Sequence, residues 1–210
     1  MSYNTDLFLF LNGPPAPAAS ILLGVRLIAG SPVIIAPLLL VWLWVRHPDQ
    51  QRAGLLAVAL SVLVGQGINL VLGALWFEPR PFMVGIGNTL VVHIADNGFP
   101  SDHSTLMFAL GTGLILTRAA RIAGLFVCMI GLGVAWARVY LGVHFPIDVL
   151  TGILVGAAAG WLACRLEPSI ARYFLPWAER LYEFLLATLR LPAVVFPRRV
   201  QPTMKSRPAP

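Results

Sequence analysis

The sequence is poor in charged residues. Only 11% of its 210 residues are Asp, Glu, Lys or Arg, while 58% are hydrophobic. A soluble domain of this size usually has about a quarter of its residues charged. Too little polar sequence therefore remains to cover a water-exposed surface, which argues against a soluble domain with buried core helices and for an integral membrane protein.

Cysteine and clustered carboxylates are also scarce. The two cysteines, Cys128 and Cys164, lie inside apolar segments with no metal-ligand spacing around them. Asp96, Asp102 and Asp148 are single carboxylates with basic residues nearby. We therefore predict no disulfide, no metal site and no cofactor.

The N-terminal residues lack the features of a cleaved signal peptide. Residues 1–15 have no basic start, and the apolar run Leu7–Leu11 is shorter than the core of a signal peptide. We expect this run to lie in the membrane interface as an amphipathic anchor.

Five apolar segments account for the hydrophobic character of the chain. A helix that spans the bilayer needs roughly 20 apolar residues, with about 17 as the lower limit. The first two segments reach this length alone, and the other three reach it only with the polar residues at their ends. The segments are Ser20–Val45, Ala53–Phe77, Thr105–Thr117, Ile122–Ala137 and Val149–Cys164. We predict an all-α integral membrane protein in which residues 1–168 form a bundle of about five transmembrane helices.

The basic residues indicate how the bundle is oriented. They gather in the first and third connections and after the fifth segment, and the positive-inside rule makes that side cytoplasmic. The opposite, outer side then carries the N-terminus and the connections 78–103 and 138–146. Three polar clusters of the chain lie in these two connections, so we expect them to meet at the outer face.

Beyond residue 168 the composition changes. Residues 169–191 mix Arg and Glu with aromatic and aliphatic residues, which is typical of an amphipathic helix on the cytoplasmic surface, with a sixth span as the alternative. Residues 192–210 are rich in Pro and Arg, and we expect a disordered basic tail that touches anionic lipid. Gly152, Gly156 and Gly160 recur every fourth residue and predict a face for close helix packing, within or between subunits.

Two of the polar clusters have the chemistry of an anion site. Arg80 precedes Pro81 just after the second segment, where its guanidinium can grip phosphate oxygens; an arginine that snorkels to lipid headgroups is the alternative. Ser101, Asp102 and His103 have the pattern of a helix start, with Ser101 as N-cap. The free N–H groups of a helix start bind anions, although capping beside a surface histidine explains the same residues.

The third cluster adds a pair that can perform chemistry. His144 and Asp148 are four residues apart at the start of the fifth segment, which places the carboxylate beside the imidazole. The carboxylate can keep one ring nitrogen protonated and leave the other as a nucleophile or base. A helix-start Asp near an interfacial histidine is the alternative. Because Arg80 and Arg138 can stabilise the charge on a transferring phosphoryl group, a metal-independent mechanism is the simpler hypothesis.

Taken together, the clusters resemble the signature of the type 2 phosphatidic acid phosphatase (PAP2) superfamily. That signature reads Lys-x6-Arg-Pro, then Pro-Ser-Gly-His, then Ser-Arg-x5-His-x3-Asp. The corresponding residues here are Arg80-Pro81, Pro100-Ser101-Asp102-His103 and Arg138-x5-His144-x3-Asp148, within residues 73–148. Within the superfamily the sequence is most similar to bacterial undecaprenyl-diphosphatases, the bacitracin-resistance branch.

The resemblance implies an enzyme and assigns roles. It implies hydrolysis of undecaprenyl diphosphate at the outer face of the bacterial inner membrane, which recycles the lipid carrier of cell-wall synthesis. His144 would be the nucleophile that forms a phosphohistidine, Asp148 would orient it, and His103 would protonate the leaving group. The substrate-binding residues would be Arg80, Pro81, Ser101, Asp102 and Arg138. The expected partners are the polyprenyl diphosphate and membrane lipids, with no nucleic acid and no obligate protein partner.

Three positions depart from the signature. Gly73 stands where the signature has lysine, Ala137 where it has the serine before the arginine, and Asp102 where it has glycine. Arg26 could replace the lysine, and His93, Asp96 and Asn97 could contact a second phosphate or form a lid. The alternatives to the diphosphatase are a phosphatase for phosphatidate or phosphatidylglycerol phosphate, a lipid phosphotransferase, and a non-catalytic lipid-phosphate binder.

Overall fold

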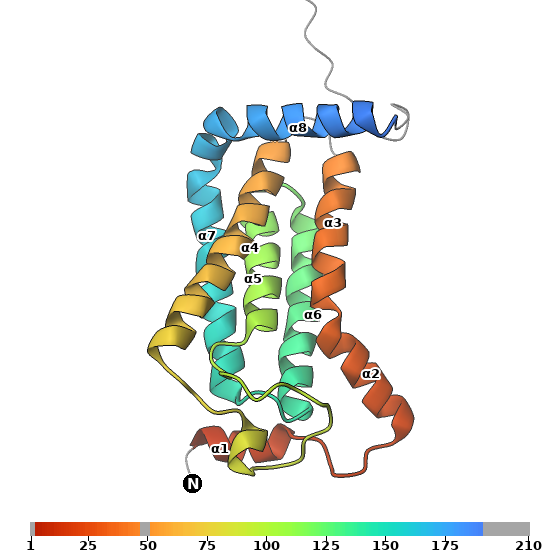
Figure 1. The fold of residues 1–210 in the computed structure, drawn as a ribbon, viewed down its shortest axis with the longest axis vertical. Helices are drawn as coiled ribbons and strands as arrows, with labels where there is room; N and C mark the ends of the chain where they lie inside the picture. Colours follow the sequence, from red (N-terminus) through yellow and green to blue (C-terminus); the bar gives the residue numbers. More distant parts are fainter. Residues whose placement is uncertain (1–2, 47–50, 191–210) are drawn as a thin grey trace, which may run out of the picture.

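The computed structural model describes residues 3–46 and 51–190, and these residues form helices without a β-strand (Figure 1). Six helices run roughly along the long axis of the bundle, and two short helices lie across its ends. The six are α2 (Ala19–Gly30), α3 (Pro32–Arg46), α4 (Arg52–Leu75), α5 (Asp102–Leu116), α6 (Arg121–Tyr140) and α7 (Pro146–Tyr173). The two across the ends are α1 (Tyr3–Leu11) and α8 (Leu175–Thr188).

The lengths and apolar composition of these helices are those of a multi-pass membrane protein. α4, α6 and α7 are each long and apolar enough to cross a bilayer, and α2 with α3 forms a bent pair that passes as a fourth span. α5 has 15 residues and lies in the middle of the bundle. The all-helical fold with three or four candidate spans confirms the all-α membrane bundle, and α5, which corresponds to the third predicted segment, is too short to be counted among them.

The first predicted segment is not one straight helix. The chain bends by 51° between α2 and α3, at Ser31. Pro32 follows the bend, and a proline has no N–H to donate to the preceding turn and clashes with it. The N-terminal half of this span, α2, therefore leans away from the bundle axis (Figure 1).

The glycines of α7 pack against α5 within the same chain. A Cβ added at Gly156 would stand 2.5 Å from the backbone oxygen of Thr105, and one added at Gly152 would stand 2.5 Å from that of Ser101. Helices can approach so closely only where side chains are absent. The predicted small-residue face is thus an intramolecular contact, and it fixes the start of α5 beside the start of α7.

The other faces of the long helices are apolar and exposed. Leu70 of α4, Phe126 of α6 and Leu154 of α7 are each more than half exposed. A helix satisfies its own backbone hydrogen bonds, so such faces are compatible with lipid.

One end of the bundle carries the long connection between α4 and α5. We call it the site end: α4 and α6 finish there, and α5 and α7 begin there. The connection contains the short 3-10 helix η1 (Pro81–Val84) and is tied down by an asparagine clamp. Asn12, just after α1, donates to Asn88 O and Tyr140 O at 3.0 Å each, and it accepts from Asn88 N. The connection is therefore held against the end of α6.

At the opposite end, α8 lies across the bundle (Figure 1). Buried Arg52 at the start of α4 lies between the rings of Trp44 and Tyr182 and is 4.0 Å from Glu179 of α8. Residues 175–188 thus form a 14-residue helix across the end of the bundle and not a sixth helix along it. The predicted basic tail, residues 192–210, lies outside the described residues.

Candidate active site

The three polar clusters come together at the site end. Arg80 follows α4, His103 lies in the first turn of α5, Arg138 lies in the last turn of α6, and His144 lies in the connection between α6 and α7. This follows from the alternating direction of the helices, which brings the C-terminal ends of α4 and α6 and the N-terminal ends of α5 and α7 to one end of the bundle.

His144 is the centre of the cluster, and its two ring nitrogens have different nearest partners, although Arg80 Nη1 is also 3.5 Å from Nδ1. Its Nδ1 is 2.8 Å from the backbone oxygen of Gly98, and its Nε2 is 3.2 Å from Arg80 Nη1 and 3.2 Å from Arg138 Nη2. A carbonyl oxygen can only accept and guanidinium nitrogens can only donate, so the proton lies on Nδ1. The lone pair of Nε2 is thus presented between two cations.

The surroundings of His144 keep it neutral. Its side chain is 2% exposed. Burial, followed by the charges of Arg138 and Arg80, lowers its pKa well below the ordinary value, against the raising effect of the Gly98 carbonyl. A neutral imidazole retains the lone pair that a nucleophile needs.

Asp148 has a different place from the one predicted. Its Oδ2 accepts from the backbone N–H of Phe145 at 2.7 Å and is 3.6 Å from His144 Nδ1, which is beyond hydrogen-bond distance. The Nδ1 proton is therefore held by Gly98, and the prediction that the carboxylate holds it was wrong. Asp148 caps the start of α7 and fixes the turn that carries His144, with its negative charge close to the ring.

Arg80 is anchored almost completely by the protein. Its Nε donates to Asp96 Oδ1 at 2.8 Å, its Nη2 to Asn97 O at 3.0 Å, and its Nη1 to Val143 O at 2.8 Å. The side chain is buried, and Pro81 next to it is buried at the start of η1. Arg80 therefore supplies a fixed positive charge, and few of its N–H groups remain available to bind a ligand.

Arg138 has fewer hydrogen bonds to the protein than Arg80. Its Nη2 is 3.1 Å from His93 Nε2 and 3.2 Å from His144 Nε2. Its Nε is buried with no hydrogen-bond partner among the described residues. A buried N–H without a partner is costly, and a phosphate oxygen would satisfy it.

The α5 start brings one further titratable group to the cluster. His103 is half-buried, makes no hydrogen bond within the described part of the chain, and lies in the electrostatic field of Arg138, His93 and Arg80. Its ring is free to contact a ligand that occupies the arginine pair.

Ser101 and Asp102 are placed less simply than predicted. Ser101 is at the N-cap position, but its hydroxyl makes no cap hydrogen bond and instead accepts from Ser104 Oγ at 3.3 Å. Asp102 Oδ1 accepts from Asn69 Nδ2 at 2.8 Å, so the carboxylate is tied to α4 and forms no ion pair with Arg80 or Arg138. Asp102 is thus not part of the arginine–histidine cluster.

A short strap, Asp96–Gly98, holds the cluster in place, and sequence reasoning missed its role. The strap binds Arg80 through Asp96 and Asn97, and it binds His144 through the Gly98 carbonyl. Asn97 fixes the strap: Oδ1 accepts from Glu78 N and Phe99 N, and Nδ2 donates to Gly73 O and Trp76 O. The Asn-Gly pair beside Asp96 was the only signal in the sequence, and it is typical of an ordinary turn.

The strap also accounts for Gly73. A Cβ added there would stand 3.2 Å from Asn97 Nδ2 and 3.4 Å from Phe99 O, so the strap already fills the space of a side chain. Arg26 does not take the place of a lysine in the cluster either, because its guanidinium donates to Leu90 O. Ala137 is fully buried in the core between α6 and its neighbours.

The geometry is suited to phosphoryl transfer. A tetrahedral dianion between Arg80 and Arg138 would place its phosphorus next to the His144 lone pair, with Arg138 Nε aimed at an oxygen. Within residues 3–46 and 51–190 no group of three His, Cys, Asp or Glu residues could hold a metal ion. The charge available for the anion is that of the two guanidinium groups.

Comparison with known proteins gives a consistent result. Residues 54–171 match the model of the PAP2 superfamily. Undecaprenyl-diphosphatase BcrC of Bacillus subtilis is 31% identical over 157 residues, which are 75% of this chain and 80% of that protein. Two solved structures share the fold at 21% identity. LpxE of Aquifex aeolicus matches with a TM-score of 0.67 over 79% of this chain and 96% of its own. A PAP2-type phosphatidylglycerolphosphate phosphatase of Bacillus subtilis matches with 0.57 over 81% and 85%.

Proposed function

The chain belongs to the PAP2 superfamily and is a membrane phosphatase, and we propose that it hydrolyses undecaprenyl diphosphate to undecaprenyl phosphate and phosphate. The observation that carries the proposal is the environment of His144. Its Nε2 is 3.2 Å from a nitrogen of each arginine, while its Nδ1 proton is bound to Gly98 O. A surface histidine would have neither the burial nor the two cations.

The first half-reaction transfers the terminal phosphoryl group to the enzyme. The Nε2 lone pair of His144 attacks the terminal phosphorus, and the bond from that phosphorus to the bridging oxygen breaks. The bridging oxygen leaves with the isoprenoid phosphate and takes a proton from His103. Arg80 and Arg138 stabilise the charge on the equatorial oxygens, which is the largest contribution a site of this kind makes.

The second half-reaction releases phosphate. Water attacks the phosphohistidine, and the bond between phosphorus and Nε2 breaks. His103 takes a proton from the attacking water, which replaces the proton that His103 donated in the first step. Gly98 O keeps the Nδ1 proton throughout, so that Nε2 returns as a neutral lone pair. The two arginines supply the positive charge, and we propose that the reaction needs no metal ion.

We also propose that the site faces the outside of the inner membrane. Arg46, Arg52 and Arg121 lie at the helix ends opposite the site, as does α8 with Arg180. The positive-inside rule makes that opposite end cytoplasmic. The carrier lipid would then be dephosphorylated at the periplasmic or exterior face.

The test is phosphate release by the purified protein in detergent with EDTA, with undecaprenyl diphosphate and phosphatidate compared at equal concentration. We expect a strong preference for the diphosphate, and no release by His144→Ala. Preference for phosphatidate would assign a general lipid phosphatase, and recovery only after Mg²⁺ is added would overturn the metal-free step. No release from either lipid would favour a phosphotransferase or a lipid-phosphate binder.

A further inference from the structure

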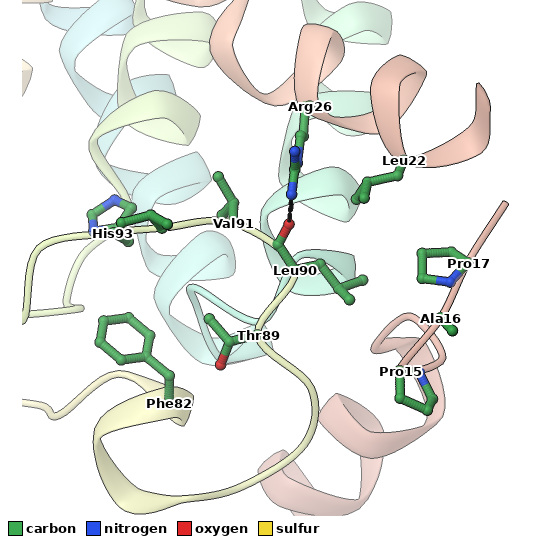
Figure 2. Close-up of a pocket in the computed structure, with 11 residues that line it drawn as sticks. Pro15, Ala16, Pro17, Leu22, Arg26, Phe82, Thr89, Leu90, Val91 and His93 are labelled. Carbon is green, nitrogen blue, oxygen red and sulfur yellow. Dashed lines mark hydrogen bonds between the residues drawn. The ribbon is translucent and has the colours of Figure 1, made fainter. Parts of the chain in front are cut away.

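A cavity of about 550 Å³ lies beside the phosphate site, and the proposed reaction does not yet use it. Its volume falls within the roughly 300–1,000 Å³ of small-molecule pockets. Figure 2 shows its walls: the connection before α2, α2 itself, and the part of the α4–α5 connection from Phe82 of η1 to His93. The lining residues are Pro15, Ala16, Pro17, Leu22, Arg26, Phe82, Thr89, Leu90, Val91, Val92 and His93.

His93 joins this cavity to the active site. It lines the cavity, and its Nε2 is 3.1 Å from Arg138 Nη2, the same nitrogen that is 3.2 Å from His144 Nε2. Its Nδ1 is 3.0 Å from Ile94 O, so the proton lies on Nδ1 and Nε2 accepts from Arg138. One guanidinium nitrogen therefore separates the cavity wall from the nucleophile.

The cavity also contains a positive charge that the protein does not neutralise. Arg26 reaches down from α2, and its Nε and Nη2 both donate to the backbone oxygen of Leu90 (Figure 2). Its Nη1 has no hydrogen-bond partner and no carboxylate lies within ion-pair distance among the described residues. The side chain is exposed, so the free Nη1 is accessible to an anion that enters the cavity.

The remaining walls are apolar except for the hydroxyl of Thr89. Proline, leucine, valine and phenylalanine side chains surround the space between Arg26 and His93. A ligand that fits this arrangement carries a phosphate at one end and a hydrocarbon chain at the other.

A second cavity at the site end does not have this character. It measures about 600 Å³ and lies between α4, the strap and the start of α5. The one charged residue on its wall is Asp102, among described residues that include Asn69 and Gly73. A carboxylate without a cation would repel the phosphates of a lipid diphosphate.

We propose that the cavity of Arg26 and His93 binds the leaving half of the substrate: the phosphate that stays on the isoprenoid, and the first isoprene units of the chain. This inference rests on the proposed function. The terminal phosphate would lie at the arginine pair, and the second phosphate would accept from the free Nη1 of Arg26. The chain would lie against Leu22 and Val91 before it continues into the bilayer. Arg26 would thus read the second phosphate of a diphosphate and distinguish it from a monophosphate.

The test combines two variants and two substrates. Arg26→Gln removes the cation and should raise KM about tenfold for both undecaprenyl diphosphate and isopentenyl diphosphate, with kcat nearly unchanged. Leu22→Trp fills the apolar end and should raise KM only for undecaprenyl diphosphate, because isopentenyl diphosphate has a single isoprene unit. Arg26→Lys should recover most of the loss.

The matched control is Leu23→Trp, since Leu23 is the next residue of α2, is 60% exposed and does not line the cavity. It should retain the KM of the wild type for both substrates. If Arg26→Gln and Leu22→Trp both retain that KM while the wild type cleaves undecaprenyl diphosphate, the cavity assignment is wrong and the proposed function stands. If the wild type cleaves neither diphosphate, the proposed function fails and the cavity assignment fails with it.

Discussion

Asn97→Ala tests whether the strap positions the catalytic groups. Asn97 makes four hydrogen bonds to the backbone, to Glu78 N, Phe99 N, Gly73 O and Trp76 O, at 2.7–3.1 Å. At about 0.5–1.5 kcal/mol for each bond, their loss removes roughly 2–6 kcal/mol from the attachment of the strap. Gly98 O and Asn97 O would then no longer hold His144 and Arg80 in place.

The expected result is a large fall in kcat with little change in KM. A displacement of about 1 Å in a reacting group costs roughly 100-fold in rate, and the lipid still binds through its chain. Phosphate release from undecaprenyl diphosphate over a range of lipid concentrations separates the two parameters, and thermal unfolding in detergent measures the stability.

The control is Asn12→Ala, which removes the asparagine clamp on Asn88 of the same connection. Asn12 makes three hydrogen bonds, to Asn88 N, Asn88 O and Tyr140 O, and it touches none of the groups that hold His144 or Arg80. It should lower the unfolding temperature to a similar extent and retain most of kcat. The positioning argument is refuted if Asn97→Ala retains kcat within about twofold while its stability falls as in Asn12→Ala.

Three further predictions follow from the site and the packing. Arg138→Lys should lower kcat roughly 100- to 1,000-fold, because a lysine ammonium cannot replace the planar guanidinium or the unpartnered Nε–H that would donate to a phosphate oxygen. A kcat near that of the wild type would contradict this. The acid limb of kcat/KM, corrected for the titration of the substrate measured by phosphorus NMR, should have its midpoint below pH 6.5. Burial lowers the pKa of His144 well below 6.5, and His144 attacks in the neutral form that predominates above its pKa; a midpoint at or above 6.5 would contradict this. Gly156→Ala should lower the unfolding temperature, by overpacking of about 1–3 kcal/mol against α5, whereas Gly67→Ala in α4 has no atom within 4 Å of the new Cβ and should not.

The sequence predicted the parts of this molecule that depend on repeated or periodic features. The apolar segments gave the all-α bundle, and the glycine spacing in α7 gave the helix contact, because both patterns act over many residues. The bend at Ser31 was missed, since Ser20–Val45 is continuously apolar and only the Gly30-Ser31-Pro32 triplet indicates a break.

The site was predictable in its residue types and not in its connections. The order of Arg80, Arg138 and His144 along the chain identified the three groups that the structure brings within 3.2 Å. The partner of His144 Nδ1 could not be predicted, because it is a backbone carbonyl that an irregular connection delivers from 46 residues away. Asp148, four residues after His144, was the obvious candidate, but its carboxylate accepts from Phe145 N and caps the start of α7 instead.

The most direct measurement traps the covalent intermediate. Undecaprenyl diphosphate with a radiolabelled terminal phosphate is mixed with the enzyme in detergent, quenched in alkali within one turnover, and the labelled peptide is mapped. The account predicts one label on His144 that is stable in alkali and released by acid, present in Asn97→Ala at a slower rate of formation, and absent from His144→Ala. Wild-type turnover that His144→Ala leaves intact, or a label on another residue, would contradict the assignment of His144 as the nucleophile.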